Sequence, residues 1–469
     1  MLKQIQVSNF KVLKDSSRIN LQPLTVLIGR NGSGKSSLIE ALDWLGRTIG
    51  EGAEVATEPF RRIDDLIHGS SVNSSRTFSI TLVFDPEDIS AGEEIQYEVE
   101  VGSDEDGLPE IEYEYLSAIK RDETFETIRT KGETRQMRVN LELIRMPSGR
   151  QEEEEEETDI ENELSEEDEQ DYVPPIYQEE TIEPDEEVEI VELDEEVSDA
   201  EELYEIEVLE EVKPSNKYKW VPTTDSNKLA LDVVERTEDL GGYKLKVFLE
   251  RAVFLRLNPH SIASFTPPRL KHSPRLLDDE GTRLAALLGE LDEESLEILV
   301  EKLSFIIQGA NSLVPHEPAG PADRRYFTFS ETINGEESML EIPAWVLSEG
   351  TRRVTAILAV LLHDQPPPLL CIEEIENGLD PWTIKYVLEE LTGAVERGTQ
   401  VILTTHSPYL LNLFPPDNIL FCDRTSKGVT FTPVSELPDL EVVQTRMGVG
   451  DLYANRFLHN KRAEMGGEE

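Results

Sequence analysis

The fold of this chain is decided by one stretch, Gly29-Arg30-Asn31-Gly32-Ser33-Gly34-Lys35-Ser36. It fits the pattern G-x-x-x-x-G-K-[ST], in which glycines let successive backbone N–H groups face a phosphate. Residues 24–28 before it read as a buried strand, and residues 37–45 after it have the apolar spacing of a helix. Strand, glycine loop and helix in this order predict a site for a nucleoside triphosphate.

Within this loop, Lys35 is expected to neutralise the β- and γ-phosphates of ATP, and the Ser36 hydroxyl to ligate Mg²⁺. The N-terminus of the following helix adds positive potential. A glycine-rich turn that fits the pattern by chance is the alternative, and both flanks argue against it. We assign nucleotide binding to the loop and the residue after it: Gly29, Arg30, Asn31, Gly32, Ser33, Gly34, Lys35, Ser36 and Ser37.

The charge of the chain is distributed unevenly. Of the formal net charge of −53 over 469 residues, residues 151–211 carry 32 Asp plus Glu and no Lys or Arg, which leaves −21 on the other 408 residues. Such a chain is not expected to bind nucleic acid through its overall field. A local basic groove stays open as an alternative, and scattered surface charge explains its candidates equally well: Arg61, Arg62, Arg269, Lys271 and Arg275.

The length suits two or three domains, or one domain with large insertions. No run of about 18 apolar residues predicts a transmembrane helix, and the first seven residues alternate like a strand and carry no signal-peptide pattern. Cys371 and Cys422 lie in apolar runs and are expected to be buried thiols, with neither disulfide nor metal-site spacing. We therefore expect a cytoplasmic protein without membrane contact.

Taken in order, the apolar patterns predict an antiparallel sheet before the acidic tract and helices after it. Strands are expected over residues 5–10, 17–21, 24–28, 77–84, 95–101 and 134–144. Beyond the tract, we expect a strand over 243–254, helices over 280–291 and 296–307, and strands over 324–329 and 339–342.

Residues 151–212 form an acidic low-complexity insertion. Its first half lacks the apolar surface to offset chain entropy and is expected to be disordered. In its second half, residues 188–193 and 203–209 have enough apolar side chains to form strands that pack against another surface. The insertion is either a solvated acidic linker or a docking surface for a basic partner or a mimic of nucleic-acid charge.

Residues 369–374 form an apolar strand that ends in two acids. In a phosphate-loop enzyme this strand lies beside the loop, so Glu373 is expected to hold the Mg²⁺ shell and Glu374 to polarise the attacking water. Acids at a strand end are common in so acidic a chain. The companion segments that follow in order favour the catalytic interpretation.

Two further polar positions follow this strand. Asp380 lies in a turn suited to contact across a subunit interface. His406 ends the buried strand 400–405 and is expected to donate a hydrogen bond to the γ-phosphate, although a lone His is more often structural.

A second anion site is predicted upstream, where Ser348 and Gly350 open an apolar helix. A Ser before a helix is ordinary capping when taken alone. Two anion sites with one phosphate loop indicate that the second serves the nucleotide of another subunit.

Together these segments resemble an ABC-type ATPase head of the RecF, SMC and OLD class, similar to AAA-type ATPases of bacterial anti-phage defence. The resemblance covers roughly residues 1–145 and 215–460. It implies that Lys35 and Ser36 belong to the phosphate loop, Glu373 and Glu374 to the metal-and-base strand, and His406 to the switch position. It likewise implies a signature at Ser348 and Gly350 and an inter-subunit loop at Asp380.

The chain also departs from that class. The signature reads Leu-Ser-Glu-Gly-Thr rather than Leu-Ser-Gly-Gly-Gln, and Glu373 replaces the usual Asp. The glutamine that usually ligates Mg²⁺ has one candidate, Gln96. No long heptad segment separates Lys35 from Ser348, so coiled-coil arms of the SMC type are absent, and only 63 residues follow His406, too few for a nuclease domain of the OLD type.

The predicted fold is α/β, a phosphate-loop NTPase of the ABC type with an antiparallel lobe, a helical lobe over about 256–365 and the acidic insertion. Residues 1–150 and 213–469 are expected to form the two halves of the ATPase head, with 151–212 between them. The implied cofactors are ATP and Mg²⁺, and the implied assembly is a head-to-tail dimer that sandwiches ATP, or a higher oligomer.

Three functions fit this reading. The first is an ATP-hydrolysing switch that controls a separate effector protein, as in bacterial anti-phage systems. The second is a RecF-like DNA-repair ATPase that binds duplex DNA, which the acidity of the chain disfavours. The third is a binding module that holds ATP and barely hydrolyses it, against which Glu374 and His406 argue.

Overall fold

The computed structural model describes residues 1–69, 76–85, 94–120, 123–131, 134–140, 218–222, 227–234, 242–264, 274–307, 309–316, 325–332, 339–425, 428–438 and 447–458. The chain divides into two units, one made of Met1–Val139 with Trp220–Glu469 and the other of Asn140–Lys219. The first unit contains the phosphate loop and the sheets around it.

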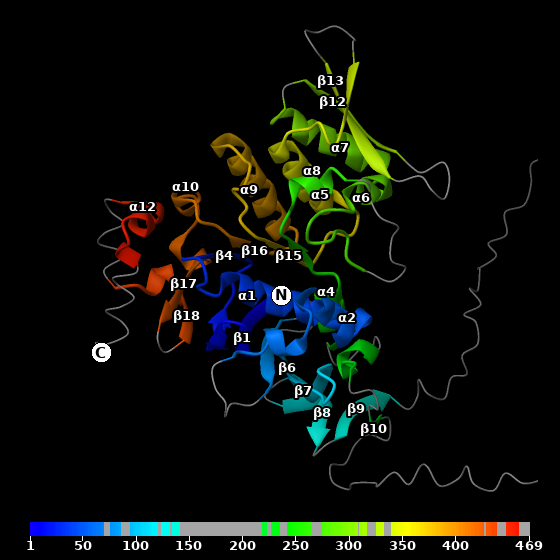
Figure 1. The fold of residues 1–469 in the computed structure, drawn as a ribbon, viewed down its shortest axis with the longest axis vertical. Helices are drawn as coiled ribbons and strands as arrows, with labels where there is room; N and C mark the ends of the chain where they lie inside the picture. Colours follow the sequence, from blue (N-terminus) through cyan, green and yellow to red (C-terminus); the bar gives the residue numbers. More distant parts are fainter. Residues whose placement is uncertain are drawn as a thin grey trace, which may run out of the picture. The chain divides into compact units, whose positions relative to one another are not determined.

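A six-stranded sheet carries the phosphate loop (Figure 1). Its order is β11-β15-β16-β4-β17-β18, in which the first five strands run parallel and β18 is antiparallel to β17. Every residue of β4, β15 and β16 is buried, as expected for parallel strands covered on both faces. The bounds are β4 Leu24–Gly29, β11 Val253–Leu255, β15 Leu369–Ile372, β16 Gln400–Thr404, β17 Ile419–Thr425 and β18 Gly428–Pro433.

A nine-stranded sheet forms the antiparallel lobe, in the order β10-β9-β8-β7-β6-β5-β1-β2, with β3 also paired to β1. Its strands alternate buried and less buried residues, the pattern of a sheet with one face on the core. The bounds are β1 Leu2–Phe10, β2 Leu13–Asp15, β3 Ile19–Asn20, β5 Phe78–Phe84, β6 Glu94–Ser103, β7 Pro109–Lys120, β8 Glu123–Lys131, β9 Thr134–Asn140 and β10 Tyr218–Pro222.

Helix α1, Lys35–Glu51, lies between these two sheets (Figure 1). Successive residues of β4 point to opposite faces of its sheet. Leu27 therefore joins the core that holds α1 and the antiparallel lobe, while Val26 and Ile28 join the core under α8, Glu349–Leu362, and α9, Pro381–Glu396. The helix that follows the phosphate loop is thus fixed from two sides.

The predicted helical lobe contains helices and also a three-stranded antiparallel sheet, β12-β13-β14. The two strands predicted over 324–329 and 339–342 pair within it, and the third, β12, was not predicted. The bounds are α5 Pro259–Ile262, α6 Leu284–Glu290, α7 Glu293–Ser304, β12 Ala310–His316, β13 Tyr326–Thr332 and β14 Met339–Pro343.

The strand predicted over residues 243–254 is wrong. Gly242–Glu250 forms helix α4, and only Val253–Leu255 forms a strand, β11. Leu245, Phe248 and Leu249 are spaced three and four residues apart, so on a helix they share one face, and all three are buried in the core that contains α1.

Two predicted helices begin elsewhere because of capping. Helix α7 begins at Glu293, three residues early, because Asp292 precedes it and its carboxylate accepts a hydrogen bond from the Ser295 N–H at 2.7 Å. Helix α6 begins only at Leu284, because the Asp278 carboxylate accepts the N–H groups of residues 282 and 283 just before it. Such local hydrogen bonds shift a boundary that the apolar spacing alone cannot place.

The remaining elements are short. Strands β2, β7, β8, β10, β17 and β18 were not predicted, although β7 begins with acidic and apolar residues in alternation, which is the period-2 pattern of a strand. The predictions for residues 151–212 lie outside the described residues. The short elements are α2 Ala53–Thr57, α10 Pro408–Leu411, α12 Val449–Ala454, and the 3-10 turns η1 Glu58–Phe60, η2 Ile63–Asp65, η3 Ala230–Val233, η4 Pro416–Asn418 and η5 Val434–Glu436.

Candidate nucleotide site

The phosphate loop connects β4 to α1 and needs its glycines for two reasons. Gly32 and Gly34 have φ of +75° and +100°, which residues with a Cβ rarely adopt. Gly29 has φ of +149°, and a Cβ built on it would meet the Cys422 carbonyl oxygen at 2.1 Å. The loop therefore turns sharply at the end of β4 while it packs against β17.

Lys35 is the first residue of α1, and its side chain folds back over the loop. It is buried, and its ammonium donates to the carbonyl oxygens of Gly29 at 2.8 Å and Arg30 at 3.1 Å. Burial lowers the pKa of Lys35, and the nearby carboxylates of Glu373 and Glu374 oppose that shift. A cation whose charge is only partly compensated is thus held at the loop.

Ser36 lies next to the end of β15. Its hydroxyl donates to Glu373 Oε2 at 2.6 Å, across 337 residues of sequence. The pairing of β15, β16 and β4 as parallel neighbours brings their carboxyl ends to one edge of the sheet. The predicted metal pair, Ser36 and Glu373, is therefore in direct contact.

Glu374 occupies the turn that leaves β15 and has φ of +49°, an uncommon conformation for a residue with a side chain. Its N–H donates to Thr404 Oγ1 at 2.8 Å, and its carboxylate accepts from Asn377 Nδ2 at 2.5 Å. Backbone strain of this kind is maintained only where surrounding contacts impose it. The neighbouring strand and turn thus hold Glu374 in place.

His406 follows β16, next to Thr404. Its backbone N–H donates to Glu376 Oε1 at 2.6 Å. Burial, and the positive charge of Lys35, lower the pKa of the imidazole, so His406 is neutral at pH 7. A neutral imidazole can either donate or accept a hydrogen bond.

One cavity of about 260 Å³ brings these side chains together. It contains most of the residues predicted to bind ATP, and Val12 and Thr404 in addition, neither of which was predicted. Gly29 and Arg30 are not among the lining residues, and their carbonyl oxygens accept hydrogen bonds from the Lys35 ammonium. The lining is Val12, Asn31, Gly32, Ser33, Gly34, Lys35, Ser36, Ser37, Glu373, Glu374, Thr404 and His406.

Ser348, Gly350 and Asp380 do not line this cavity. Ser348 precedes α8 and accepts the Thr351 N–H at 3.0 Å, and Asp380 precedes α9 and accepts the Trp382 N–H at 2.9 Å. Gly350 approaches the turn before α9 so closely that a Cβ on it would meet the Gly378 carbonyl oxygen at 2.5 Å. The structure thus brings Gly350 against the turn that precedes Asp380, and none of the three residues lines the cavity with Lys35.

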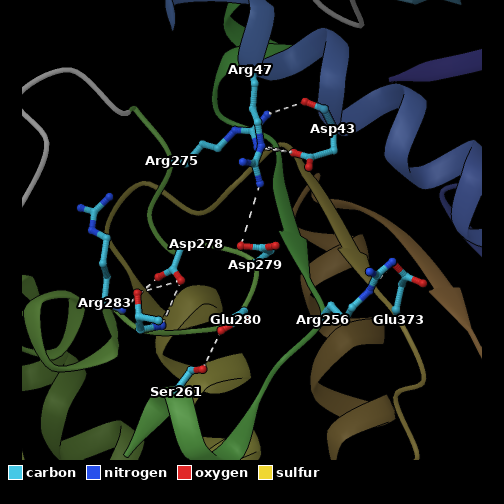
Figure 2. A network of polar contacts seen from close by, with 11 residues as sticks. Asp43, Arg47, Arg256, Ser261, Arg275, Asp278, Asp279, Glu280, Arg283 and Glu373 are labelled. Atoms are coloured by element: carbon cyan, nitrogen blue, oxygen red, sulfur yellow. Dashed lines mark hydrogen bonds and ion pairs between the residues drawn. The ribbon is translucent and has the colours of Figure 1, made fainter. Parts of the chain in front are cut away.

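Two residues near the site were not predicted. Arg256, directly after β11, donates to Glu373 Oε1 from Nε at 3.1 Å and from a terminal nitrogen at 2.6 Å. Figure 2 shows the two side chains lying together. Tyr453 of α12 donates its hydroxyl to the Gly29 carbonyl oxygen at 3.3 Å. The only sequence signal for Arg256 was a cation after a short apolar run, which is too common to single out.

Three of the five candidates for a basic groove lie among the described residues. Arg275 is buried and pairs with Asp43, and Arg61 and Arg62 are exposed. Arg269 and Lys271 lie outside the described residues. Gln96 lies in β6, paired with β5 and β7, and is not among the cavity residues, so the candidate for the glutamine ligand is not at the site.

The donors at the cavity suit Mg²⁺. This cation is usually held by one or two carboxylates with waters and substrate phosphates, not by an all-protein cage. The Ser36 hydroxyl and the Glu373 carboxylate supply such a partial set. Among the described residues, no group of three or more His, Cys, Asp or Glu side chains could hold a metal ion.

Both cysteines are buried and free, as predicted. Burial raises the pKa of both thiols, so neither is reactive. Within the described residues, no helix is long and apolar enough to cross a membrane.

Comparison with known proteins identifies the class. A family model described as "AAA domain, putative AbiEii toxin, Type IV TA system" matches residues 24–412. The chain is 36% identical over 86 residues to the OLD nuclease of Thermus scotoductus, 34% over 89 residues to the chromosome partition protein Smc of Lactiplantibacillus plantarum, and 31% over 85 residues to the energy-coupling factor transporter ATP-binding protein EcfA2 of Mycoplasmopsis synoviae. The resemblance to the SMC and OLD types is confirmed.

These matches are partial. They cover 18%, 19% and 18% of this chain, and 15%, 7% and 27% of the respective relatives, so the chain spans less than a third of each. Among solved structures, an Smc head bound to the C-terminal winged-helix domain of ScpA covers 92% of this chain and 97% of its own, at 13% identity and a TM-score of 0.47. The SMC head of Thermotoga maritima covers 92% and 98%, at 14% identity and a TM-score of 0.41.

Proposed function

The chain belongs to this AAA domain family of ATPases, and from that membership we propose that it hydrolyses ATP as a switch that controls a partner protein. One observation carries the proposal. Lys35, Ser36, Glu373, Glu374 and His406, which come from three separate segments of the sequence, line one cavity at the edge of a parallel sheet. The ABC-type relatives support hydrolysis as well as binding.

The residues divide the chemistry among them. Lys35 and the N–H groups of the loop bind the phosphates and stabilise charge as it develops on the transferred phosphoryl group. Ser36 and Glu373 would hold Mg²⁺, which would supply further neutralisation of phosphate charge when it is bound. Glu374 accepts a proton from the attacking water, and neutral His406 donates a hydrogen bond toward the γ-phosphate.

A second copy of the chain would complete the site. Ser348 and Gly350 open α8 and lie beside the turn that carries Asp380, yet none of the three lines the chain's own cavity. A head-to-tail pair with two-fold symmetry would place them over the nucleotide of the partner. Binding of ATP would then assemble the pair, and hydrolysis would release it.

The partner is proposed to be a separate effector in bacterial anti-phage defence. The family description, with its toxin and toxin–antitoxin system, supports a role of this kind. The acidic tract over residues 151–212 supplies a charge suited to a basic protein partner. Control of duplex DNA is the other candidate function, and the acidity of the chain weighs against it.

Steady-state ATP turnover tests this proposal. We expect Glu374→Gln to lower turnover about 100-fold or more, since general bases contribute roughly 10²–10⁴-fold, while ATP binding persists and light scattering detects an ATP-dependent dimer. Glu389→Gln, a change on the exposed face of α9, is the matched control and should leave turnover unchanged.

Three results would argue against parts of this proposal. Strong stimulation of wild-type turnover by duplex DNA would favour the repair function. Unchanged turnover in Glu374→Gln would remove Glu374 from the mechanism, and an unchanged mass with ATP and Mg²⁺ would count against the sandwiched pair.

A further inference from the structure

Arg256 stands beside Glu373 because of strand register. Strand β11 runs parallel to β15, with Leu255 opposite Ile372, and the Glu373 N–H donates to the Leu255 carbonyl oxygen at 2.8 Å. The next residue on each strand is therefore Arg256 on one and Glu373 on the other. The outermost strand of the core sheet thus places a guanidinium at the predicted metal site.

The two oxygens of Glu373 have separate partners. Oε1 accepts hydrogen bonds from Nε and Nη2 of Arg256, at 3.1 and 2.6 Å, while Oε2 accepts one from the Ser36 hydroxyl at 2.6 Å. The Glu373 side chain is 12% exposed, so this charge-assisted contact is only weakly screened on the carboxylate side. With both oxygens held, the carboxylate has one orientation, in which Oε2 faces Ser36.

Arg256 also contacts the helix that carries Ser36. Its guanidinium lies 3.6 Å from Glu40 Oε1, and the other Glu40 oxygen lies 2.7 Å from Lys11 Nζ. Glu40 is four residues after Ser36 and so lies on the same face of α1, one turn along. Arg256 therefore bridges the strand and the helix that supply the two halves of the metal site.

The backbone of Arg256 is held from the other direction. Its N–H donates to the Asp279 carbonyl oxygen at 2.8 Å. Figure 2 shows the network in which this segment lies: the carboxylate of Asp279 faces Arg47, and Asp43 pairs with both Arg47 and the buried Arg275. The side chain of Arg256 is about half exposed, and its backbone is fixed by this hydrogen bond.

We propose that Arg256 is a positioning residue for the metal site. It orients Glu373 so that Oε2 accepts the hydrogen bond of the Ser36 hydroxyl, which leaves a lone pair of the Ser36 oxygen free for Mg²⁺. This inference rests on the proposed function. It also gives a reason for Glu at a position where the class usually has Asp, since the longer side chain reaches Arg256 and Ser36 at once. Outer contacts that orient metal ligands change metal affinity or activity by about 10- to 100-fold when they are removed.

The test is the metal dependence of nucleotide binding, measured without turnover. The dissociation constant of a fluorescent, non-hydrolysable ATP analogue is measured by anisotropy in EDTA and in Mg²⁺. The value in EDTA divided by the value in Mg²⁺ measures how much the metal contributes to binding. We expect Arg256→Gln to lower this ratio about tenfold with little change in the EDTA value. Arg256→Lys should restore part of it, because a single ammonium keeps the charge and loses the fork.

Arg251→Gln is the matched control, because Arg251 lies in the connection between α4 and β11 and its guanidinium donates to the carbonyl oxygens of Gln365 and Pro366. Its ratio should equal that of the wild type, and thermal melting checks that each variant is folded. An unchanged ratio in Arg256→Gln would overturn the proposal. A raised ratio would overturn it too, because Arg256 would then compete with the metal.

The outcome separates this inference from the proposed function. If the wild type binds the analogue more tightly with Mg²⁺ and Arg256→Gln behaves in the same way, only the role of Arg256 is refuted. If the wild type binds the analogue in neither condition, nucleotide binding itself is refuted, and the role of Arg256 with it.

Discussion

His406 illustrates how burial and charge combine at a single residue. The pKa of its imidazole is lowered by burial first and by the Lys35 ammonium second, while Glu376 and Glu374 oppose the shift. The unfolded chain takes up this proton near the ordinary value of about 6.5, and the folded chain only at lower pH. Below that value the unfolded state binds more protons, so the folded state loses stability as pH falls.

We therefore expect the free energy of unfolding to fall more steeply between about pH 6.5 and pH 5 in the wild type than in His406→Gln. Urea denaturation at several pH values measures both slopes, and the other titrating groups cancel in the difference. Above about pH 7 the two proteins should differ by a constant amount. Identical slopes below pH 6.5 would show that the imidazole titrates at its ordinary value in the folded chain.

At the scale of the elements, strand β7 anchors η3, which follows the acidic tract in the sequence. Glu114 of this strand is fully buried and accepts the N–H groups of Ala230 and Leu231 in η3, at 2.7 and 2.9 Å. It also accepts the Tyr97 hydroxyl and lies 3.4 Å from Arg135. A buried carboxylate with these four partners fastens η3 to the antiparallel lobe, and η3 in turn packs beside α1.

We expect Glu114→Ala to destabilise the fold by about 3–5 kcal/mol, the range for breaking a buried ion pair by removing one partner. The two N–H groups of η3 and the Arg135 guanidinium would each lose a hydrogen-bond acceptor at a buried position. The free energy of unfolding from urea titration measures the loss. The control Glu105→Ala changes an exposed turn residue and should cost less than about 0.5 kcal/mol; equal effects of the two changes would contradict the anchoring role.

At the scale of the whole molecule, the ATPase head is assembled from two separated halves of the chain. Strands β9 and β10, which end and begin at residues 140 and 218, are neighbours in the antiparallel sheet. The described residues on either side of the acidic tract therefore belong to one sheet. The lining residues of the cavity that the structure describes come from both halves.

We expect replacement of residues 151–212 by a short Gly-Ser linker to leave ATP turnover within about twofold and the melting temperature nearly unchanged, because closing a loop between adjacent strands costs little entropy. Binding of a basic partner should be lost with the 32 acidic residues. Turnover assays, thermal melting and co-purification measure the three effects. Loss of turnover with a preserved melting temperature would assign the segment a role in catalysis.

The sequence by itself determined the centre of this protein. The phosphate loop is local, because the strand, the glycines and Lys35 are consecutive and their geometry follows from neighbouring residues. The antiparallel lobe followed from apolar periods, and the α/β class with its parallel core followed from the phosphate loop and the resemblance of its motifs; the structure confirms all three. The strand that ends in Glu373 and Glu374 was found in the same way, although the roles of these residues stay predictions.

Only the tertiary structure decided what depends on distant neighbours. Residues 243–250 form a helix because their apolar face packs on α1. Glu114 lies 116 residues from one of its partners and Arg256 lies 117 residues from Glu373, and nothing local marks either contact. That Ser348 and Asp380 do not line the cavity with Lys35 is equally a matter of tertiary structure, because no local pattern marks it.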